Sequence, residues 1–256
     1  IAADALFGTD GMAVDATARD LPLAPFLALV SAPEIDGTVS GTARLRGRPD
    51  SPTGEVRLSL AGLREAGLEA SEATSLAGEI AGRFADGRVD ATARLGGPDE
   101  IALEAVLSAP LGGDGPLDGR ITGTIELSFL PKVVDLYGDE LSGRLDLDLA
   151  LAGSPADPKM AGRAQISGGA YESAAQGTVL RDMTAEVVGD QDKVRLVSFT
   201  AGDGNGGTVT AGGAVRLDPD AGFPLELHAA LDRFAALRRR EATVQATGRI
   251  DLTRNL

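Results

Sequence analysis

The sequence has no cysteine, no tryptophan and a single histidine, His228. Without cysteine there can be no disulfide framework, no thiolate metal site and no cysteine nucleophile. One histidine is too few for a histidine-based zinc site. A Ser-His-Asp triad would have to use His228, and no Gly-x-Ser-x-Gly motif accompanies it. We therefore expect no enzyme activity, no metal site and no cofactor.

Basic charge is also scarce, because 24 Lys and Arg stand against 38 Asp and Glu, a net charge of −14. Nucleic acid is not an expected partner, since its phosphates attract a basic protein surface. The sequence shows neither a signal peptide nor an apolar run of about 18 residues. It opens abruptly at Ile1 and stops at Leu256, just after an apparent strand. We expect a fragment of a longer protein whose targeting segment lies elsewhere.

Aliphatic residues at alternate positions are the dominant pattern. Between Arg144 and Leu151, four leucines alternate with Arg144, Asp146, Asp148 and Ala150. Successive side chains of a strand point to opposite faces, so this pattern predicts a strand with one apolar and one wet face. The pattern recurs at Val56–Leu60, Ile101–Leu103, Ile121–Leu127, Val194–Leu196, Val215–Leu217, Leu225–Leu227 and Ile250–Leu252. Gly- and Pro-rich turns between these segments predict successive β-hairpins.

Three short segments have apolar residues at helical spacing: Leu23–Val30, Leu130–Tyr137 and Leu231–Leu237. We expect short amphipathic helices there. Their phenylalanines, Phe26, Phe129 and Phe234, recur at about a hundred residues, and each segment precedes a Gly-bearing alternating strand. This spacing predicts repeats: a first β unit at residues 1–118, a second at 119–224, and the start of a third, continuous with the second, at 225–256.

Two polar features have simple interpretations. His228 shares its strand phase with Glu226, which predicts a solvated strand residue. Gly202–Gly207 is rich in glycine but lacks the lysine of a phosphate-binding loop, so we expect a flexible hairpin turn.

The aliphatic stripe has two interpretations, an ordinary buried β core or the lining of an open trough. Large aromatic rings normally help to fill a closed core, and this chain has only 7 Phe and 2 Tyr. The apolar phase also persists along the chain with little change in composition. Both features favour an all-β, elongated, curled sheet with an open groove and a few short helices. The predicted lining residues are Leu145, Leu147, Leu149, Leu151, Ile166, Val194, Leu196, Val215, Leu217, Leu225, Leu227 and Ile250.

An ordered set of short motifs in the second half resembles the C-terminal domain of the TamB (translocation and assembly module) family, in the AsmA-like group. The motifs are Leu141–Gly143, Leu151–Pro158, Gly168–Ser173, Gly177–Asp182, Gly206–Gly213, Phe223–Leu227, and Leu237–Arg240 leading to Gly248–Leu252. The first half, with Phe7–Asp10, Leu21–Pro25 and Ile35–Gly37, is similar to a preceding repeat of such a protein.

This resemblance implies a periplasmic segment of a protein that an N-terminal helix, outside this chain, anchors in the inner membrane. Its curled sheet would be the trough called a β-taco. Its function would be to bridge the inner and outer membranes and to shield phospholipid acyl chains during intermembrane transport. An outer-membrane barrel protein of the TamA type would be a partner.

Two other functions stay open. The first is a chaperone-like scaffold for outer-membrane protein assembly, in which an exposed sheet edge pairs with a strand of an unfolded outer-membrane protein. The second is a rigid spacer with no ligand.

Overall fold

The computed structural model describes residues 2–8, 11–23, 35–65, 76–97, 101–112, 115–132, 139–155, 158–173, 175, 177–216, 223–238 and 243–254. Almost all of these residues lie in antiparallel strands, and the described part contains one short 3-10 helix, η3 (Leu127–Lys132). No described helix is long and apolar enough to cross a membrane.

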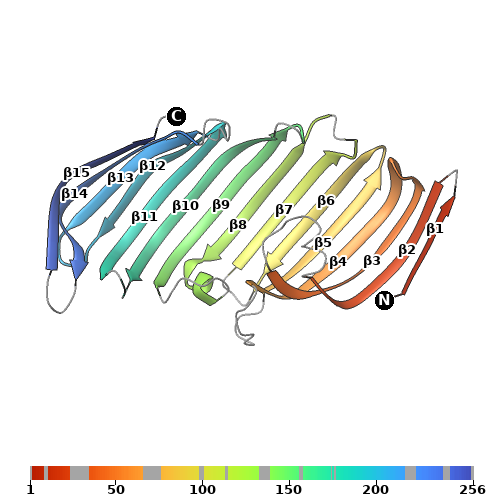
Figure 1. The fold of residues 1–256 in the computed structure, drawn as a ribbon, viewed down its shortest axis with the longest axis horizontal. Coiled ribbons are helices and arrows are strands. Elements are labelled where there is room, and N and C mark those ends of the chain that lie inside the picture. Colours follow the sequence, from red (N-terminus) through yellow and green to blue (C-terminus); the bar gives the residue numbers. More distant parts are fainter. Residues whose placement is uncertain are drawn as a thin grey trace. The chain divides into compact units, whose positions relative to one another are not determined.

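The strands follow one another in the sheet in the order of the chain, so each pairs with its neighbours in sequence. Their bounds are β1 (Ala2–Gly8), β2 (Gly11–Pro22), β3 (Ile35–Arg48), β4 (Ser51–Glu65), β5 (Leu76–Ala85), β6 (Arg88–Gly96), β7 (Ile101–Pro110), β8 (Asp118–Glu126), β9 (Glu140–Gly153), β10 (Pro158–Ser173), β11 (Thr178–Gln191), β12 (Lys193–Gly202), β13 (Thr208–Arg216), β14 (Leu225–Arg238) and β15 (Thr243–Arg254) (Figure 1). β1 and β15 are the two ends of this order, so the sheet is open. The prediction of an all-β, open antiparallel sheet is confirmed.

The chain forms two compact units. Unit 1 contains Ile1–Gly123 and Ala150–Lys159, and unit 2 contains Thr124–Leu149 and Met160–Leu256. The predicted repeat boundaries, at residues 118/119 and 224/225, stay a prediction.

Unit 1 contains the antiparallel strands β1–β7, and the alternation of its sequence sets the register. Val14 faces Leu45, Leu45 faces Gly54, and Gly54 faces Phe84. Directly opposed residues share a face of the sheet. Apolar positions therefore line up from strand to strand on one face.

β-Bulges keep the apolar positions in phase where a strand bends. In β2 one extra residue lies between Ala18 and Leu21, and Asp20 has a φ of 48°. The Asp20 N–H, which the bulge displaces from the regular ladder, donates to Ser40 Oγ at 2.9 Å. In β14 the extra residue lies between Leu231 and Phe234, and the Arg233 N–H donates to Thr247 Oγ1 at 2.9 Å. A hydroxyl on the next strand thus satisfies the bulge N–H in both units.

The helix predicted at Leu231–Leu237 is wrong, because this segment lies in β14. Two bulges cause the error. β14 has one extra residue between Leu231 and Phe234 and another between Ala235 and Leu237. Each insertion lengthens the spacing of residues that share a face of the strand from two positions to three. Apolar residues three apart can then share a face of a strand, as they would in a helix.

The other two predicted helices fall mainly outside the described residues. For Leu130–Tyr137, residues 127–132 form η3 and residues 133–138 are not described. For Leu23–Val30, residues 24–30 lie outside the described residues.

Unit 2 contains the antiparallel strands β10–β15, and its sheet curls. β11 and β14 are not neighbours in the sheet order, yet Thr178 Oγ1 at the start of β11 donates to the Ala236 carbonyl of β14 at 3.2 Å. Met183, Ala201, Phe234 and Ala235 are buried at the same strand ends. The curl therefore encloses a small core at one end of this unit.

Candidate hydrophobic lining

Four cross-strand rows on one face of unit 1 are apolar. The rows carry only aliphatic, aromatic or glycine positions, and no acid, base, hydroxyl or amide. In strand order they are Ala5–Val14–Leu45–Gly54–Phe84–Val89–Ala109, Ala3–Ala16–Ala43–Val56–Gly82–Ala91–Leu107, Ala18–Gly41–Leu58–Ile80–Ala93–Ala105 and Leu21–Val39–Leu60–Gly78–Leu95–Leu103. We call these residues the unit 1 lining.

The opposite face of unit 1 is charged and solvated. Arg44 and Arg46 pair with Asp15 at 3.5 and 3.4 Å, and Arg94 pairs with Glu104 at 2.8 Å. The hydrogen bond with Glu104 raises the pKa of Arg94 above its ordinary value. Exposed pairs of this kind add little stability, but they keep one face wet. The sheet of unit 1 is thus amphipathic, with one apolar face and one charged face.

Apart from the buried Val39 and Gly78, the unit 1 lining is only half-buried. Leu45, Val56, Leu58 and Ile80 all keep intermediate exposure, and so do Leu95, Leu103 and Leu107. In a closed β core, inward side chains of this size would be buried against a second layer. Among the described residues of unit 1, each strand contacts mainly its sheet neighbours. The apolar face is therefore an uncovered surface as far as the structure describes it.

Glycines smooth this surface by facing leucines across the strands. A methyl group added to Gly41, Gly123 or Gly213 would lie 2.9 Å from Cδ2 of Leu58, Leu103 or Leu227 respectively. Such a group would also overlap the backbone of the facing strand. Each leucine can therefore lie across a bare glycine instead of standing against another side chain. The high glycine content supports a low, even relief of the lining.

Unit 2 has a matching face, made of three cross-strand rows. The rows are Gly162–Gly189–Val194–Val215–Leu225–Arg254, Ala164–Val187–Leu196–Gly213–Leu227–Leu252 and Ile166–Ala185–Phe199–Ala211–Ala229–Ile250. We call them the unit 2 lining. Arg254 is the one charged residue in these rows.

The register brings most of the predicted lining residues together. Ile166, Val194, Leu196, Val215, Leu225, Leu227 and Ile250 all belong to the unit 2 lining. Leu145, Leu147 and Leu149 lie half-buried in the part of β9 that belongs to unit 2. Leu151 belongs to unit 1, where its Cβ lies 3.3 Å from the position of a methyl group added to Gly119. Leu217 falls outside the described residues.

No protein-family model, curated protein or solved structure matches the chain significantly.

The sequence analysis did not identify the apolar rows of β1–β7 as lining. Their signal is nevertheless present as alternation, for example at Val56, Leu58 and Leu60 in β4. It is weaker because glycine and alanine occupy many of the positions.

The Gly202–Gly207 turn is a well-anchored structure. Asp203 is 1% exposed, and its Oδ1 accepts hydrogen bonds from the Asn205 and Gly207 N–H groups at 2.7 and 3.0 Å. Its Oδ2 accepts from the Ala235 N–H of β14 at 2.9 Å. The carboxylate therefore ties the β12–β13 hairpin to β14 and helps close this end of unit 2.

A second polar cluster lies near the start of β9. Tyr171 O–H donates to Asp139 Oδ2 at 2.5 Å. This bond lowers the pKa of Asp139, with Ser173 adding to the effect, and it raises the pKa of Tyr171. Phe129 of η3, also in unit 2, is completely buried.

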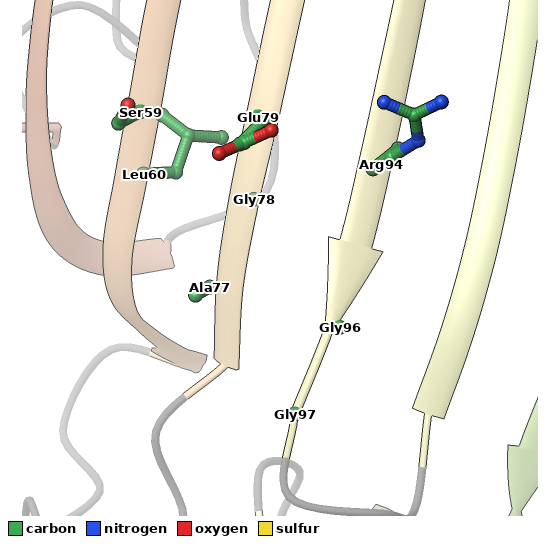
Figure 2. A pocket seen from close by; sticks show the side chains of 8 residues that line it. All are labelled: Ser59, Leu60, Ala77, Gly78, Glu79, Arg94, Gly96 and Gly97. Carbon is green, nitrogen blue, oxygen red and sulfur yellow. The ribbon is translucent and has the colours of Figure 1, made fainter.

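A hollow in unit 1 offers little for catalysis. It measures about 550 Å³ and lies at the ends of β4, β5 and β6, where Leu60 and Gly78 meet Glu79 and Arg94 (Figure 2). Arg94 is already paired with Glu104. Among the described residues no group of three or more His, Asp or Glu side chains is placed to hold a metal ion. His228 is exposed on the face opposite Leu227.

Proposed function

We propose that this chain is a non-enzymatic, periplasmic groove segment that shields phospholipid acyl chains as they pass between the inner and outer membranes. The observation that carries the proposal is the half-exposed lining of each unit, which lacks charge throughout the four rows of the unit 1 lining. The resemblance to the TamB family supports the periplasmic location, an inner-membrane anchor beyond this chain, and a partner of the TamA type.

The energetics favour an acyl chain as the occupant of this surface. Exposing a tail to water costs about 0.8 kcal/mol per CH₂, or on the order of 12 kcal/mol for some fifteen carbons. An aliphatic surface can offset most of that cost. The even relief created by glycine–leucine pairs such as Gly41–Leu58 provides no deep pocket that would trap a tail.

A polypeptide is a poorer occupant of the same face. Apart from Arg254, the lining rows offer no side-chain hydrogen-bond donors or acceptors, so most N–H and C=O groups of a bound client would lose water without replacement. Each unsatisfied group would cost about 1–3 kcal/mol. A lipid tail carries no such groups.

The test combines lipid extraction with a face-specific pair of variants. Phospholipid bound to the purified 256-residue chain is extracted and quantified by mass spectrometry. Ile80→Asp with Leu227→Asp places one carboxylate in each lining and should reduce bound phospholipid by at least about tenfold, because a charge is costly beside a hydrocarbon tail. Circular dichroism should show the sheet preserved, since both positions are half-exposed.

The matched control is Ala81→Asp with Ala230→Asp, which adds the same charge to the opposite face. Ala81 lies opposite Arg57, and Ala230 lies opposite Arg249. This control should keep its bound lipid. Equal loss in both variants, or no phospholipid in the wild-type chain, would refute the proposal. Unfolding of the Ile80→Asp variant alone would identify that position as closed core and would also contradict it.

The second candidate function is the chaperone-like scaffold, and β15 is the observation that favours it. β15 is the last strand in the sheet order, and Val244, Ile250 and Leu252 are 50%, 59% and 55% exposed. Such an edge can accept a client strand by β-augmentation. Binding of an outer-membrane β-strand peptide that a proline scan of β15 abolishes, with no lipid bound, would favour this function over lipid shielding.

A further inference from the structure

A cluster of cations surrounds one end of the unit 2 lining. A hollow of about 260 Å³ is lined by Lys193 and Arg195 of β12, Ala214 and Arg216 of β13, and Pro224, Leu225 and Glu226 at the start of β14. Leu225 is also a member of the unit 2 lining. The cations and Glu226 belong to the outer face and Leu225 to the lining, so the hollow and the apolar surface meet where these strands begin or end.

Two of these cations oppose each other directly, since Lys193 faces Arg216 across β12 and β13. Like charges in such a pair destabilise a sheet. Other arginines of unit 2 have acidic partners, as Arg163 has Glu186 at 3.2 Å and Arg181 has Glu172 at 2.8 Å. Within the part of the chain that the structure describes, Lys193, Arg195 and Arg216 form no ion pair.

A fourth cation lies on the apolar side of the same strand end. Arg254 faces Leu225 across β14 and β15 and is exposed. It also has no ion-pair partner among the described residues. Leu225 thus has Arg254 beside it on the lining, and Lys193, Arg195 and Arg216 around the adjoining hollow.

We infer that this strand end binds the phosphate of an anionic glycerophospholipid headgroup while the acyl chain lies on the unit 2 lining. The inference rests on the proposed function and specifies the lipid class. The hollow itself holds three cations, Lys193, Arg195 and Arg216, and one carboxylate, Glu226, while Asp190 faces Lys193 from β11. A phosphate would relieve the repulsion between Lys193 and Arg216. The continuity with Leu225 makes a lipid headgroup, rather than free phosphate, the natural source of that phosphate.

Because the net charge of the chain is −14, binding to anionic vesicles is a stringent test for a local cationic site. A chain of this charge should be repelled by anionic membranes unless a local cationic site overcomes the repulsion. Co-flotation of the wild-type chain is measured with phosphatidylglycerol vesicles and with phosphatidylcholine vesicles. We expect tighter binding to phosphatidylglycerol at low salt.

The variant Arg216→Gln with Arg254→Gln should lose about tenfold of its affinity for phosphatidylglycerol vesicles. Its binding to phosphatidylcholine should not change. The matched control, Arg19→Gln with Arg249→Gln, removes the same charge from exposed strand positions that do not line the hollow and should keep the preference. Equal losses in both variants would attribute the preference to net charge and overturn the inference.

Two further outcomes separate this inference from the proposed function. A wild-type chain that carries extracted phospholipid but binds both vesicle types equally would refute the headgroup site and leave the lipid groove standing. A chain that binds no lipid would refute both. If millimolar inorganic phosphate abolished the phosphatidylglycerol preference, the site would bind free phosphate and the headgroup assignment would fall.

Discussion

Replacing Asp203 with asparagine tests whether one buried carboxylate holds the closed end of unit 2. The two carboxylate oxygens accept three backbone N–H groups, two within the β12–β13 turn and one from Ala235 in β14. In the orientation that preserves more hydrogen bonds, the side-chain oxygen of the asparagine still accepts from the Asn205 and Gly207 N–H groups. The asparagine then directs its NH₂ group at the Ala235 N–H, which becomes an unsatisfied buried donor.

The expected loss is about 2–4 kcal/mol in the free energy of unfolding of unit 2, because one charge-assisted bond is lost and one donor stays unpaired. Urea denaturation measures the loss. Hydrogen exchange should show faster opening at the Ala235 amide than at the Asn205 amide. Asp251→Asn is the control, since Asp251 is exposed opposite His228 and should change stability by less than about 0.5 kcal/mol.

Either of two results would refute this reasoning. A stability of Asp203→Asn within about 0.5 kcal/mol of the wild type would show that the carboxylate is not essential to the turn. A large loss with unchanged exchange at Ala235 would show that the link to β14 contributes nothing.

Two further predictions concern a glycine and a tyrosine. Gly213→Ala should lower the free energy of unfolding, measured by urea titration, by about 2–3 kcal/mol, because the methyl group would lie 2.8 Å from Leu227 Cα. The control Gly112→Ala should leave the free energy of unfolding unchanged, because a methyl group there would have no neighbour within 4 Å. The Tyr171 hydrogen bond holds the pKa of Asp139 below 3.8, so its stabilisation is present above that value and is lost as the pH falls through the folded pKa. The decline in urea midpoint from about pH 5 to about pH 3 should therefore be shallower in Tyr171→Phe than in the wild type, and equal slopes would contradict this.

The strands and their apolar face could be predicted from the sequence because both depend on a local period of two. Leu225 and Leu227, or Val194 and Leu196, need only an extended backbone to share a face. Register then follows, because a slip by one residue would expose every apolar side chain in the strand. The lining residues therefore meet across strands that follow one another in the sequence.

Bulges and long-range polar contacts could not be predicted in the same way. The bulge at Arg233 makes Leu231 and Phe234 look helical, and nothing in the local pattern reveals the extra residue. Asp203 in the Asp-Gly-Asn-Gly-Gly run carries a recognisable signal for a side-chain-capped turn. Its bond to Ala235, 32 residues away, depends on the curl of the sheet and is invisible in the sequence.

The order of the strands has a consequence for how the chain is made. Because every strand pairs with the one before it, each new hairpin finds its partner already in place, and no strand must wait for a distant segment to be synthesised. Closing such short loops costs little entropy, which favours fast, stepwise folding. A polypeptide of this kind can grow as a ribbon during synthesis, one hairpin at a time, with only β1 and its newest strand as edges open to misassembly.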